Sequence, residues 1–163
     1  MIVHPLFGRK ANGASARWPV RAGGVTGRVG SFGETRRNSD GSPKMHRGID
    51  WLAPVGSAVY AAHDGRVQRC GEQSEGKGYG QRIYLYLDGT GSHVSLLTIY
   101  AHLCVQFVSL GEVVRPGHCI GRVGRSGNVA DDCPDHLHFE VREGDVGKDS
   151  ALDPEWWLHE RMS

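Results

Sequence analysis

The sequence lacks the features that would place it in a membrane, in a secretory pathway or on nucleic acid. No apolar run approaches the roughly 18 residues of a membrane span, and the opening MIVHPLFGRK has neither the basic start nor the cleavage site of a secretory signal. Its 19 Lys and Arg nearly balance 18 Asp and Glu, and the net charge of +1 does not favour a nucleic-acid partner. We therefore expect a chain that is made in the cytoplasm without a signal peptide, binds no nucleic acid and does not insert into a membrane.

The four cysteines show no CxxC spacing, which argues against a zinc site built from thiolates. An even number of cysteines permits disulfide bonds, but disulfides are uncommon in proteins that carry no export signal. We expect buried free thiols at all four positions, which are Cys70, Cys104, Cys119 and Cys133.

Helical patterns are scarce, whereas glycine is abundant. The 24 glycines among 163 residues are about twice the usual share of ~7%, and their scatter is typical of short strands joined by tight turns. The exception is DPEWWLHERM at residues 153–162, where Asp153 can cap a helix and Pro154 can take its first position. We expect an all-β fold with a short C-terminal helix, which Trp156 and Trp157 anchor to the domain.

The chain divides into an N-terminal arm or loop, residues 1–24, and a single domain, residues 25–163. The arm contains prolines and glycines but little periodicity. Five arginines without neighbouring acids gather in and just beyond it. They could attract an anionic polymer, although a solvated surface is the simpler interpretation. These arginines are Arg17, Arg21, Arg28, Arg36 and Arg37.

Residues 53–67 and 113–127 resemble each other and predict a duplicated hairpin. Each begins with Pro and Gly, continues as a short apolar strand and ends in a glycine-bounded strand. Between the copies, QRIYLYL at residues 81–87 alternates as a strand, and a DGTGSH turn leads to a second strand at residues 94–103. Two related hairpins favour two small sheets that face each other across one groove.

His136 and His138 stand two residues apart in HLHFEVR, whose alternation predicts a half-buried strand. Side chains at this spacing lie on one face of a strand, roughly 6.5 to 7 Å apart at the backbone. One imidazole could then bind a metal while the other reaches a substrate or a water molecule. Taken alone, the run is more simply interpreted as a strand whose exposed face carries two histidines. Residues elsewhere in the chain must therefore indicate whether it belongs to a metal or catalytic site.

His46 and Asp50 form an HxxxD motif without helical periodicity around it. On a straight strand the two residues would stand about 13 Å apart, too far to share an ion. The chain must bend between them if they are to act together, and Gly48 would allow such a bend. His102, at the end of the strand predicted at residues 94–103, would by itself be a half-buried histidine.

Together these residues supply more imidazole and carboxylate than chance would place at strand ends. Zinc accepts nitrogen and carboxylate ligands, and catalytic sites use three protein ligands and leave a fourth position for water. Five candidates are two more than the metal needs, so the surplus histidines could act as acid, base or oxyanion partner. The five are His46, Asp50, His102, His136 and His138. We interpret the remaining histidines as surface or structural: His4, His63, His93, His118 and His159.

The ordered pattern HxxxD, then YAHL at residues 100–103, then HLHFE resembles the lysostaphin-type zinc endopeptidases, which cut the peptide cross-links of bacterial peptidoglycan. The likeness runs from about Val25 to Leu158. It implies a small antiparallel β barrel-sandwich hybrid built on a duplicated hairpin, Zn²⁺ as cofactor and peptidoglycan peptide as substrate. It assigns His46, Asp50 and His138 as metal ligands, and His102 and His136 as the catalytic pair.

The chain departs from that family before the HxH strand, where GRSGNVADDCPDHLHF replaces a glycine- and threonine-rich turn ending in Gly-Pro. The departure bears on the shape of one groove wall and leaves the ligand set intact. Interpeptide glycines and direct stem-peptide links are both open as the bond that is cut. The loops at residues 34–45, 71–80 and 126–135 would decide between them.

Two roles follow from the resemblance. The first is a bare catalytic domain that acts on the cell wall, as a phage lysin, as a virion tail component with phage tail proteins as possible partners, or as a bacterial enzyme exported by other means. The alternative is a catalytically silent module of the same fold with a structural or interaction role. Carriers of this architecture present a lysine at a hairpin tip and silent relatives lack a ligand, whereas this chain has no such lysine and keeps every ligand. The enzyme is therefore favoured.

Overall fold

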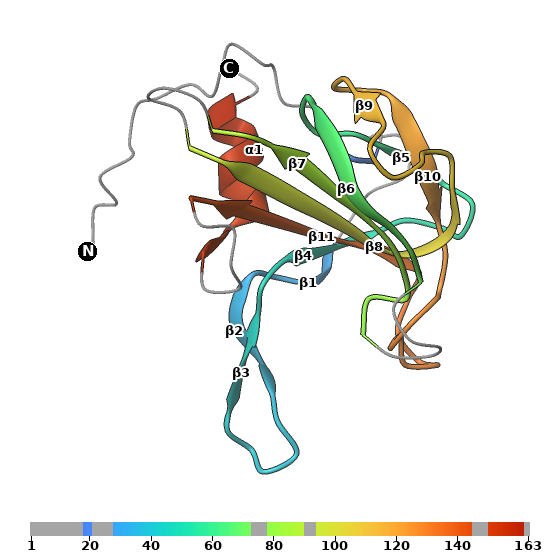
Figure 1. Ribbon diagram of the computed structural model, residues 1–163. Helices are drawn as coiled ribbons and strands as arrows, with labels where there is room; N and C mark the ends of the chain where they lie inside the picture. Colours follow the sequence, from blue (N-terminus) through green and yellow to red (C-terminus); the bar gives the residue numbers. More distant parts are fainter. Residues whose placement is uncertain (1–17, 21–27, 73–77, 90–93, 145–149, 162–163) are drawn as a thin grey trace.

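Antiparallel strands dominate the part of the protein that the structure describes. The computed structural model describes residues 18–20, 28–72, 78–89, 94–144 and 150–161 (Figure 1). Within these ranges the all-β expectation with a short C-terminal helix is confirmed. The elements are β1 (Arg28–Gly30), β2 (Gly33–Arg37), β3 (Pro43–His46), β4 (Ile49–Leu52), β5 (Ala58–Tyr60), β6 (Gly65–Glu72), β7 (Gln81–Leu87), β8 (Leu96–Gln106), β9 (Val113–Val114), β10 (Cys119–Val123), β11 (His136–Glu143), β12 (Ala151–Leu152) and α1 (Pro154–Arg161).

A long sheet in the order β1-β4-β11-β8-β7-β6-β9 carries the site. Its centre is β8, whose first eight residues are buried between β7 and β11. In β7, Ile83 and Leu85 are fully buried while Tyr84 and Tyr86 are partly exposed, as an alternating strand with one face on the core requires. The strands predicted at residues 81–87 and 94–103 are thus present.

The two related segments pair with each other, so the prediction that each closes into its own hairpin is wrong. β5 of the first copy pairs with β10 of the second, and β6 of the first pairs with β9, which opens the second. The reason is that Ala61 and Ala62, between β5 and β6, are fully buried, so this connection does not make the surface turn of a hairpin. Figure 1 shows β5, β9 and β10 grouped beside the long strands. Within the described residues the sheet does not close into a barrel.

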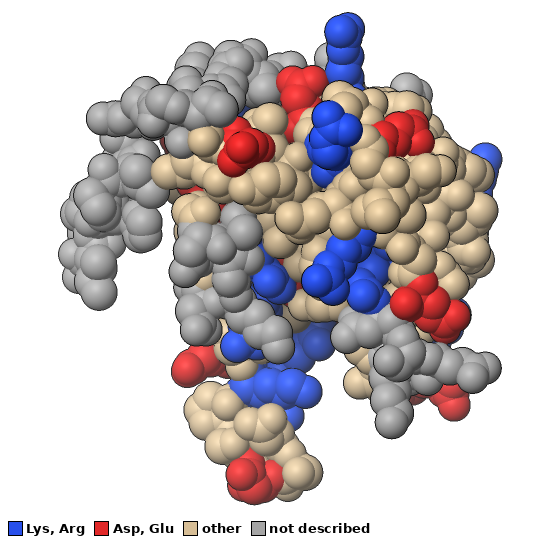
Figure 2. Space-filling model, viewed as in Figure 1, with Lys and Arg blue, Asp and Glu red and all other residues tan. Residues whose placement is uncertain are grey.

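A hairpin made of β2 and β3 projects from the sheet (Figure 1) and leads the chain into the site. Its turn, residues 38–42, contains Asp40, whose carboxylate accepts hydrogen bonds from the backbone and hydroxyl of Ser42. The sequence signals predicted this turn as a loop but not the paired strands on either side. Gly33 pairs with His46 at the base of the hairpin. Figure 2 shows lysine and arginine side chains where the hairpin joins the rest of the molecule and acidic side chains at its tip; Arg37, Lys44 and Asp40 are exposed.

Helix α1 packs against the sheet through one side only. Asp153 caps it by accepting the backbone N–H of Glu155 at 2.9 Å, as predicted. Trp157 is buried, and its indole N–H donates to Glu143 at 2.9 Å. The expected anchoring is confirmed for Trp157, whereas Trp156 is 42% exposed, because adjacent helical residues face different directions. In the described part of the chain, no helix is long and apolar enough to cross a membrane.

The expectation for the cysteines is half correct. All four are free thiols, but Cys104 is exposed and Cys70, Cys119 and Cys133 are partly exposed. Of the predicted arm at residues 1–24, only Trp18–Val20 lies within the described residues. Val20 is buried in the core and forms an isolated bridge with Val59.

Candidate metal centre

His46 and Asp50 meet because the chain bends between β3 and β4. The bend at Gly48 presses the chain against β11, where a Cβ on this residue would overlap the carbonyl oxygen of Phe139 and approach Cε1 of His138 to 3.0 Å. Glycine is required at this position because a Cβ would collide with β11. A left-handed backbone is not the reason, because Gly48 does not have a positive φ. β4 then pairs with β11, so that Asp50 lies directly opposite His138.

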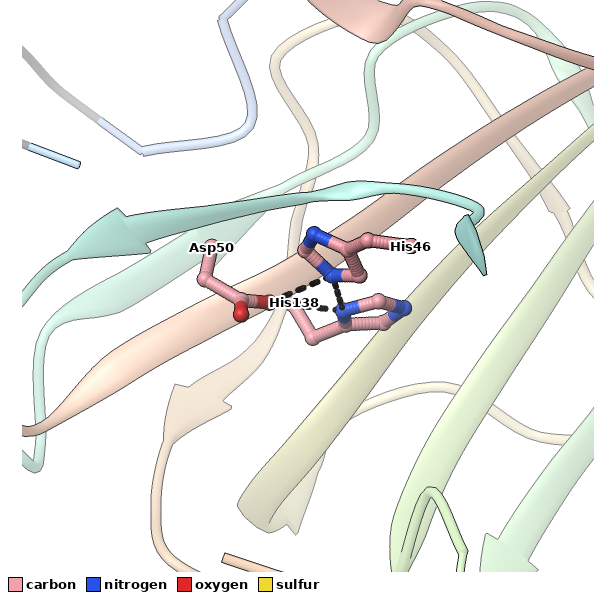
Figure 3. Close-up of side chains that lie close together, drawn as sticks. All are labelled: His46, Asp50 and His138. Carbon is pink, nitrogen blue, oxygen red and sulfur yellow. Dashed lines mark hydrogen bonds and ion pairs between the residues drawn. The ribbon is translucent and has the colours of Figure 1, made fainter. Parts of the chain in front are cut away.

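Three atoms of these residues converge on one point, and Figure 3 shows their side chains pointing toward one another. Nδ1 of His138 lies 2.7 Å from Oδ1 of Asp50 and 3.2 Å from Nε2 of His46, which lies 3.3 Å from the same carboxylate oxygen. Ligands of a tetrahedral zinc ion at about 2.1 Å stand about 3.4 Å apart. The separations are close to that value, and two imidazole nitrogens with one carboxylate are a donor set that zinc accepts.

A cationic group already contacts this cluster. Nη2 of Arg36 donates to Oδ2 of Asp50 and, at 3.1 Å, to Nε2 of His46. The sequence pattern favours a solvated surface position for Arg36. These contacts show that this interpretation is wrong for Arg36. The contact shows that Nε2 of His46 offers a lone pair and that the cluster attracts positive charge.

Each of the two histidines of the cluster, His46 and His138, has its far nitrogen held by an acceptor. Nδ1 of His46 donates to the carbonyl oxygen of Ser31 at 2.8 Å. Nε2 of His138 donates to Oε1 of Glu140 at 3.1 Å. Because carbonyl and carboxylate oxygens only accept hydrogen bonds, these far nitrogens carry protons, and the near nitrogens face Asp50.

Charge in the cluster is strongly coupled. Burial disfavours the imidazolium of His138, but hydrogen bonds to Asp50 and Glu140 outweigh burial and raise the pKa of His138 to about 9. Burial disfavours the carboxylate of Asp50, yet hydrogen bonds from His138 and His46 hold its pKa well below its usual range. A metal ion would therefore replace a proton on Nδ1 of His138, which makes metal binding release a proton at neutral pH.

His136 and His102, hereafter the two flanking histidines, stand beside the cluster. Nε2 of His136 lies 3.9 Å from Oδ1 of Asp50, and its ring centroid is 5.2 Å from that of His102. The ring of His102 is 5.8 Å from that of His138. The structure thus brings all five residues singled out from the sequence into one site.

The strand that carries His136 and His138 is buried on both faces, so its expected half-buried character is wrong. Leu137 and Phe139 face the apolar core, while the histidines and Glu140 are covered by the rest of the site. The alternation predicted which residues share a face. It could not predict that a second layer of polar residues would cover that face.

His102 lies within β8 in a left-handed conformation, with φ of 61°. This conformation is strained for a residue with a side chain. Its N–H donates to the carbonyl of Tyr79 and its own carbonyl accepts from Gly124, both at 2.9 Å. At this point β8 leaves β11, which it last pairs at Ala101, and begins to pair β10 at Leu103. Burial lowers the pKa of His102 to about 4, which keeps it neutral at pH 7.

A buried polar array behind His138 was not identified from the sequence. Glu140 accepts from the hydroxyl of Tyr79 at 2.5 Å through Oε1, and from Nε and Nη2 of Arg142 at 3.1 and 2.5 Å through Oε2. These bonds outweigh burial and lower the pKa of Glu140 to about 2. The alternation of HLHFEVR already places Glu140 and Arg142 on the face of the histidines. No local signal points to Tyr79.

The remaining histidines within the described residues lie away from the site. His63 is buried, and its Nε2 hydrogen-bonds the hydroxyl of Thr98 at 2.9 Å. Burial lowers the pKa of His63 to about 4. It has the structural role expected of it, and His118 and His159 are exposed. His4 and His93 lie outside the described residues.

Comparison with known proteins agrees with this geometry. Residues 44–154 match Peptidase family M23. The chain is 35% identical over 109 residues to the peptidoglycan DD-endopeptidase ShyC of Vibrio cholerae serotype O1, a match that covers 66% of this chain but only 22% of that relative. The chain thus spans less than a quarter of that relative's length.

Two solved structures are similar to the whole domain. The catalytic domain of lysostaphin from Staphylococcus simulans superposes with a TM-score of 0.68 at 26% identity, covering 82% of this chain and 92% of that domain. A zinc-containing peptidase from Vibrio cholerae superposes with a TM-score of 0.69 at 26% identity, covering 86% of this chain and 39% of that chain. The expected fold family is confirmed.

Proposed function

Because the chain belongs to Peptidase family M23, we propose that it is a zinc-dependent endopeptidase that hydrolyses peptide cross-links of bacterial peptidoglycan. The observation that carries the proposal is the convergence of one aspartate and two histidines within 4.8 Å of one another, with two further histidines beside them. Similarity to a peptidoglycan DD-endopeptidase supports the substrate class, and similarity to a zinc-containing peptidase supports the metal.

The metal ligands in this proposal are His46, Asp50 and His138. Zinc held there would supply a Lewis acid that activates water for attack and polarises the scissile carbonyl. The buried carboxylate of Asp50 offsets part of the charge of the ion, and the hydrogen bonds at the far nitrogens of the two histidines hold their rings in position.

The two flanking histidines move protons in this proposal. Nε2 of one of them accepts a proton from the attacking water, and the other stabilises the resulting anion or protonates the leaving amine. His102 is neutral at pH 7, so one of its ring nitrogens has a lone pair that can accept a proton. His136 has its Nε2 beside Asp50 and hence beside the position of the ion.

The β2–β3 hairpin beside the site carries exposed side chains of both charges, with Glu34 and Asp40 as the acidic ones. Arg37 and Lys44 are exposed on the β2–β3 hairpin, which leads directly into His46 (Figure 2). Stem peptides of peptidoglycan carry carboxylates, which such residues attract at long range. Which cross-link is cut would follow from comparing wall types in the same assay.

The decisive experiment measures turbidity loss of purified peptidoglycan from several wall types, with and without a chelator, together with the metal content of the same sample. We expect chelator-sensitive lysis of one wall type with about one zinc per chain, the stoichiometry of a single three-ligand site. Absence of lysis in a sample that holds zinc would contradict catalysis and favour the silent structural role.

Variants then separate the two kinds of residue. His102→Ala and His136→Ala should each abolish cleavage yet retain zinc, whereas His138→Ala should lose both. His118→Ala, at an exposed position away from the site, is the matched control and should cleave like the wild type. Normal cleavage by either flanking variant would overturn its assignment.

A further inference from the structure

The far nitrogens of the two flanking histidines are held by the two ends of one loop. Nδ1 of His102 donates to the carbonyl oxygen of Ser126 at 2.8 Å, and Nδ1 of His136 donates to that of Pro134, also at 2.8 Å. Both carbonyls belong to residues 124–135, hereafter the β10–β11 loop. This loop is the stretch in which the chain departs most from the pattern it resembles.

These two bonds favour one proton position in each imidazole, and Sγ of Cys133, 3.6 Å from Nδ1 of His136, is a further polar group at that nitrogen. A carbonyl oxygen can only accept, so Nδ1 must be protonated in both neutral rings and Nε2 must present a lone pair. A general base at the metal-activated water needs that lone pair. If either carbonyl moved away, the ring could adopt the other tautomer, in which Nε2 carries a hydrogen and cannot accept a proton.

The Pro134 end of the loop is held by Arg125. Its Nη1 donates to the carbonyl of Cys133 and to Oδ1 of Asp135, both at 2.8 Å. Its Nη2 donates to the carbonyls of Ala130 and Asp131 at 2.9 and 3.3 Å. One planar guanidinium thus bonds the residues on both sides of Pro134 and the middle of the loop, a fork that a lysine cannot reproduce.

The Ser126 end of the loop is held independently of Arg125. The hydroxyl of Ser126 donates to the carbonyl of Leu103 at 2.7 Å and accepts the backbone N–H of Gln81 at 2.8 Å. Gly127 packs so closely on Gly80 that a Cβ on Gly127 would stand 2.8 Å from the Cα of Gly80. The carbonyl of Ser126 is therefore positioned by the strands next to it.

We propose that Arg125 and Ser126 are positioning residues that set the proton position in the two flanking histidines, Arg125 for His136 and Ser126 for His102. The expected effect on catalysis rests on the proposed function. The effect of Arg125 and Ser126 on the proton positions does not depend on it. The side chain of Arg125 is 34% exposed, so water can replace its hydrogen bonds and the domain should still fold without it. Without the Arg125 side chain, the carbonyl of Pro134 would no longer be held in a fixed position.

The test reads the tautomers directly. Long-range ¹⁵N–¹H spectra of the ring nitrogens would be recorded for the ¹⁵N-labelled full chain, with and without zinc. In the wild type we expect both flanking histidines in the Nδ1–H form. Arg125→Ala should mix the tautomers of His136 and leave His102 unchanged, and Ser126→Ala should do the reverse. Arg122→Ala, which removes an arginine that bonds the carbonyl of Gly56, is the matched control and should change neither.

Kinetics on soluble cross-linked wall fragments supply the second measurement. We expect Arg125→Ala to lower kcat about 10- to 100-fold while KM and zinc content stay at wild-type values, because misplacement of a reacting group by about 1 Å has effects of that size. Arg125→Lys, which keeps the charge but not the fork, should restore only part of kcat. A general loss of folding would instead lower zinc content and change the spectrum throughout the protein.

Retention of the Nδ1–H form of His136 and of wild-type kcat in Arg125→Ala would overturn the inference. If Arg125→Ala does not fold, the tautomer of His136 in Arg125→Lys and that of His102 in Ser126→Ala decide it. A wild type that holds zinc but cleaves no wall fragment would refute the proposed function, while the tautomer spectra would still test the positioning roles separately.

Discussion

The substitution Glu140→Gln tests the polar array behind His138 with the loss of a single charge. Glu140 is 1% exposed, and its two oxygens accept from four donor groups. These belong to Tyr79, His138 and, twice, Arg142. Glutamine has the same shape but only one oxygen, because its other terminal atom is an NH₂ donor. In either orientation of the amide, two of the four donors therefore face another donor.

The expected loss follows from which donors are left without an acceptor. If the amide oxygen faces Arg142, then Tyr79 and the ring N–H of His138 lose theirs, and the ring is free to turn away from the metal. If it faces His138, the guanidinium of Arg142, which is 6% exposed, loses its acceptor, and in both orientations Arg142 loses its counter-ion because glutamine is neutral. Breaking a buried ion pair by removing one partner costs about 3–5 kcal/mol. Loss of the group that orients a metal-bound histidine weakens metal binding about 10- to 100-fold.

Two assays separate these effects. Urea unfolding of the metal-free protein gives the free energy of unfolding, and competition with a chelating indicator gives the dissociation constant for zinc. Glu143→Gln is the matched control: it lies in the same strand but pairs with Arg161 and Trp157, so it should reduce stability without changing zinc affinity. If Glu140→Gln binds zinc as tightly as the wild type, the argument that Glu140 orients His138 is refuted.

Two further predictions concern stability. Because burial lowers the pKa of His63 to about 4 from its ordinary 6.5, the unfolded chain takes up this proton first, so the free energy of unfolding should fall by up to about 3 kcal/mol as the pH decreases from about 6.5 to about 4. His63→Gln should lack this component, and urea unfolding that shows the same gap between variant and wild type at pH 7 and pH 4.5 would contradict it. Gly48→Ala should cost about 1–3 kcal/mol by overpacking against Phe139, and thermal unfolding at the wild-type temperature would show that the bend can relax.

Local patterns in the sequence were enough to predict several elements. The alternation of QRIYLYL depends only on which neighbouring residues are apolar, and it predicted β7 correctly. Asp153 and Pro154 predicted the start of α1, because capping acts within one turn. The same alternation in HLHFEVR placed His136 and His138 on one face of β11.

Pairing between distant segments was not predictable in the same way. The sequence predicted two local hairpins, but the structure pairs β5 with β10. This pairing buries Val59 and Ile120 in a common core. Each strand alone fits either arrangement. The β2–β3 hairpin was also missed, since its exposed polar residues give no apolar alternation to detect.

For the site, the sequence by itself determined the chemistry and the tertiary structure determined the geometry. The residue types and order in HxxxD, YAHL and HLHFE were sufficient to select five candidate residues for a metal site. Only the fold brought Asp50 opposite His138, gave His102 its left-handed backbone, and placed Arg125 within hydrogen-bond distance of the residues on both sides of Pro134. The physical reason is that side-chain identity is a local property of the sequence. The distance between two side chains instead depends on strand register and packing, which are set by contacts between residues far apart in the chain.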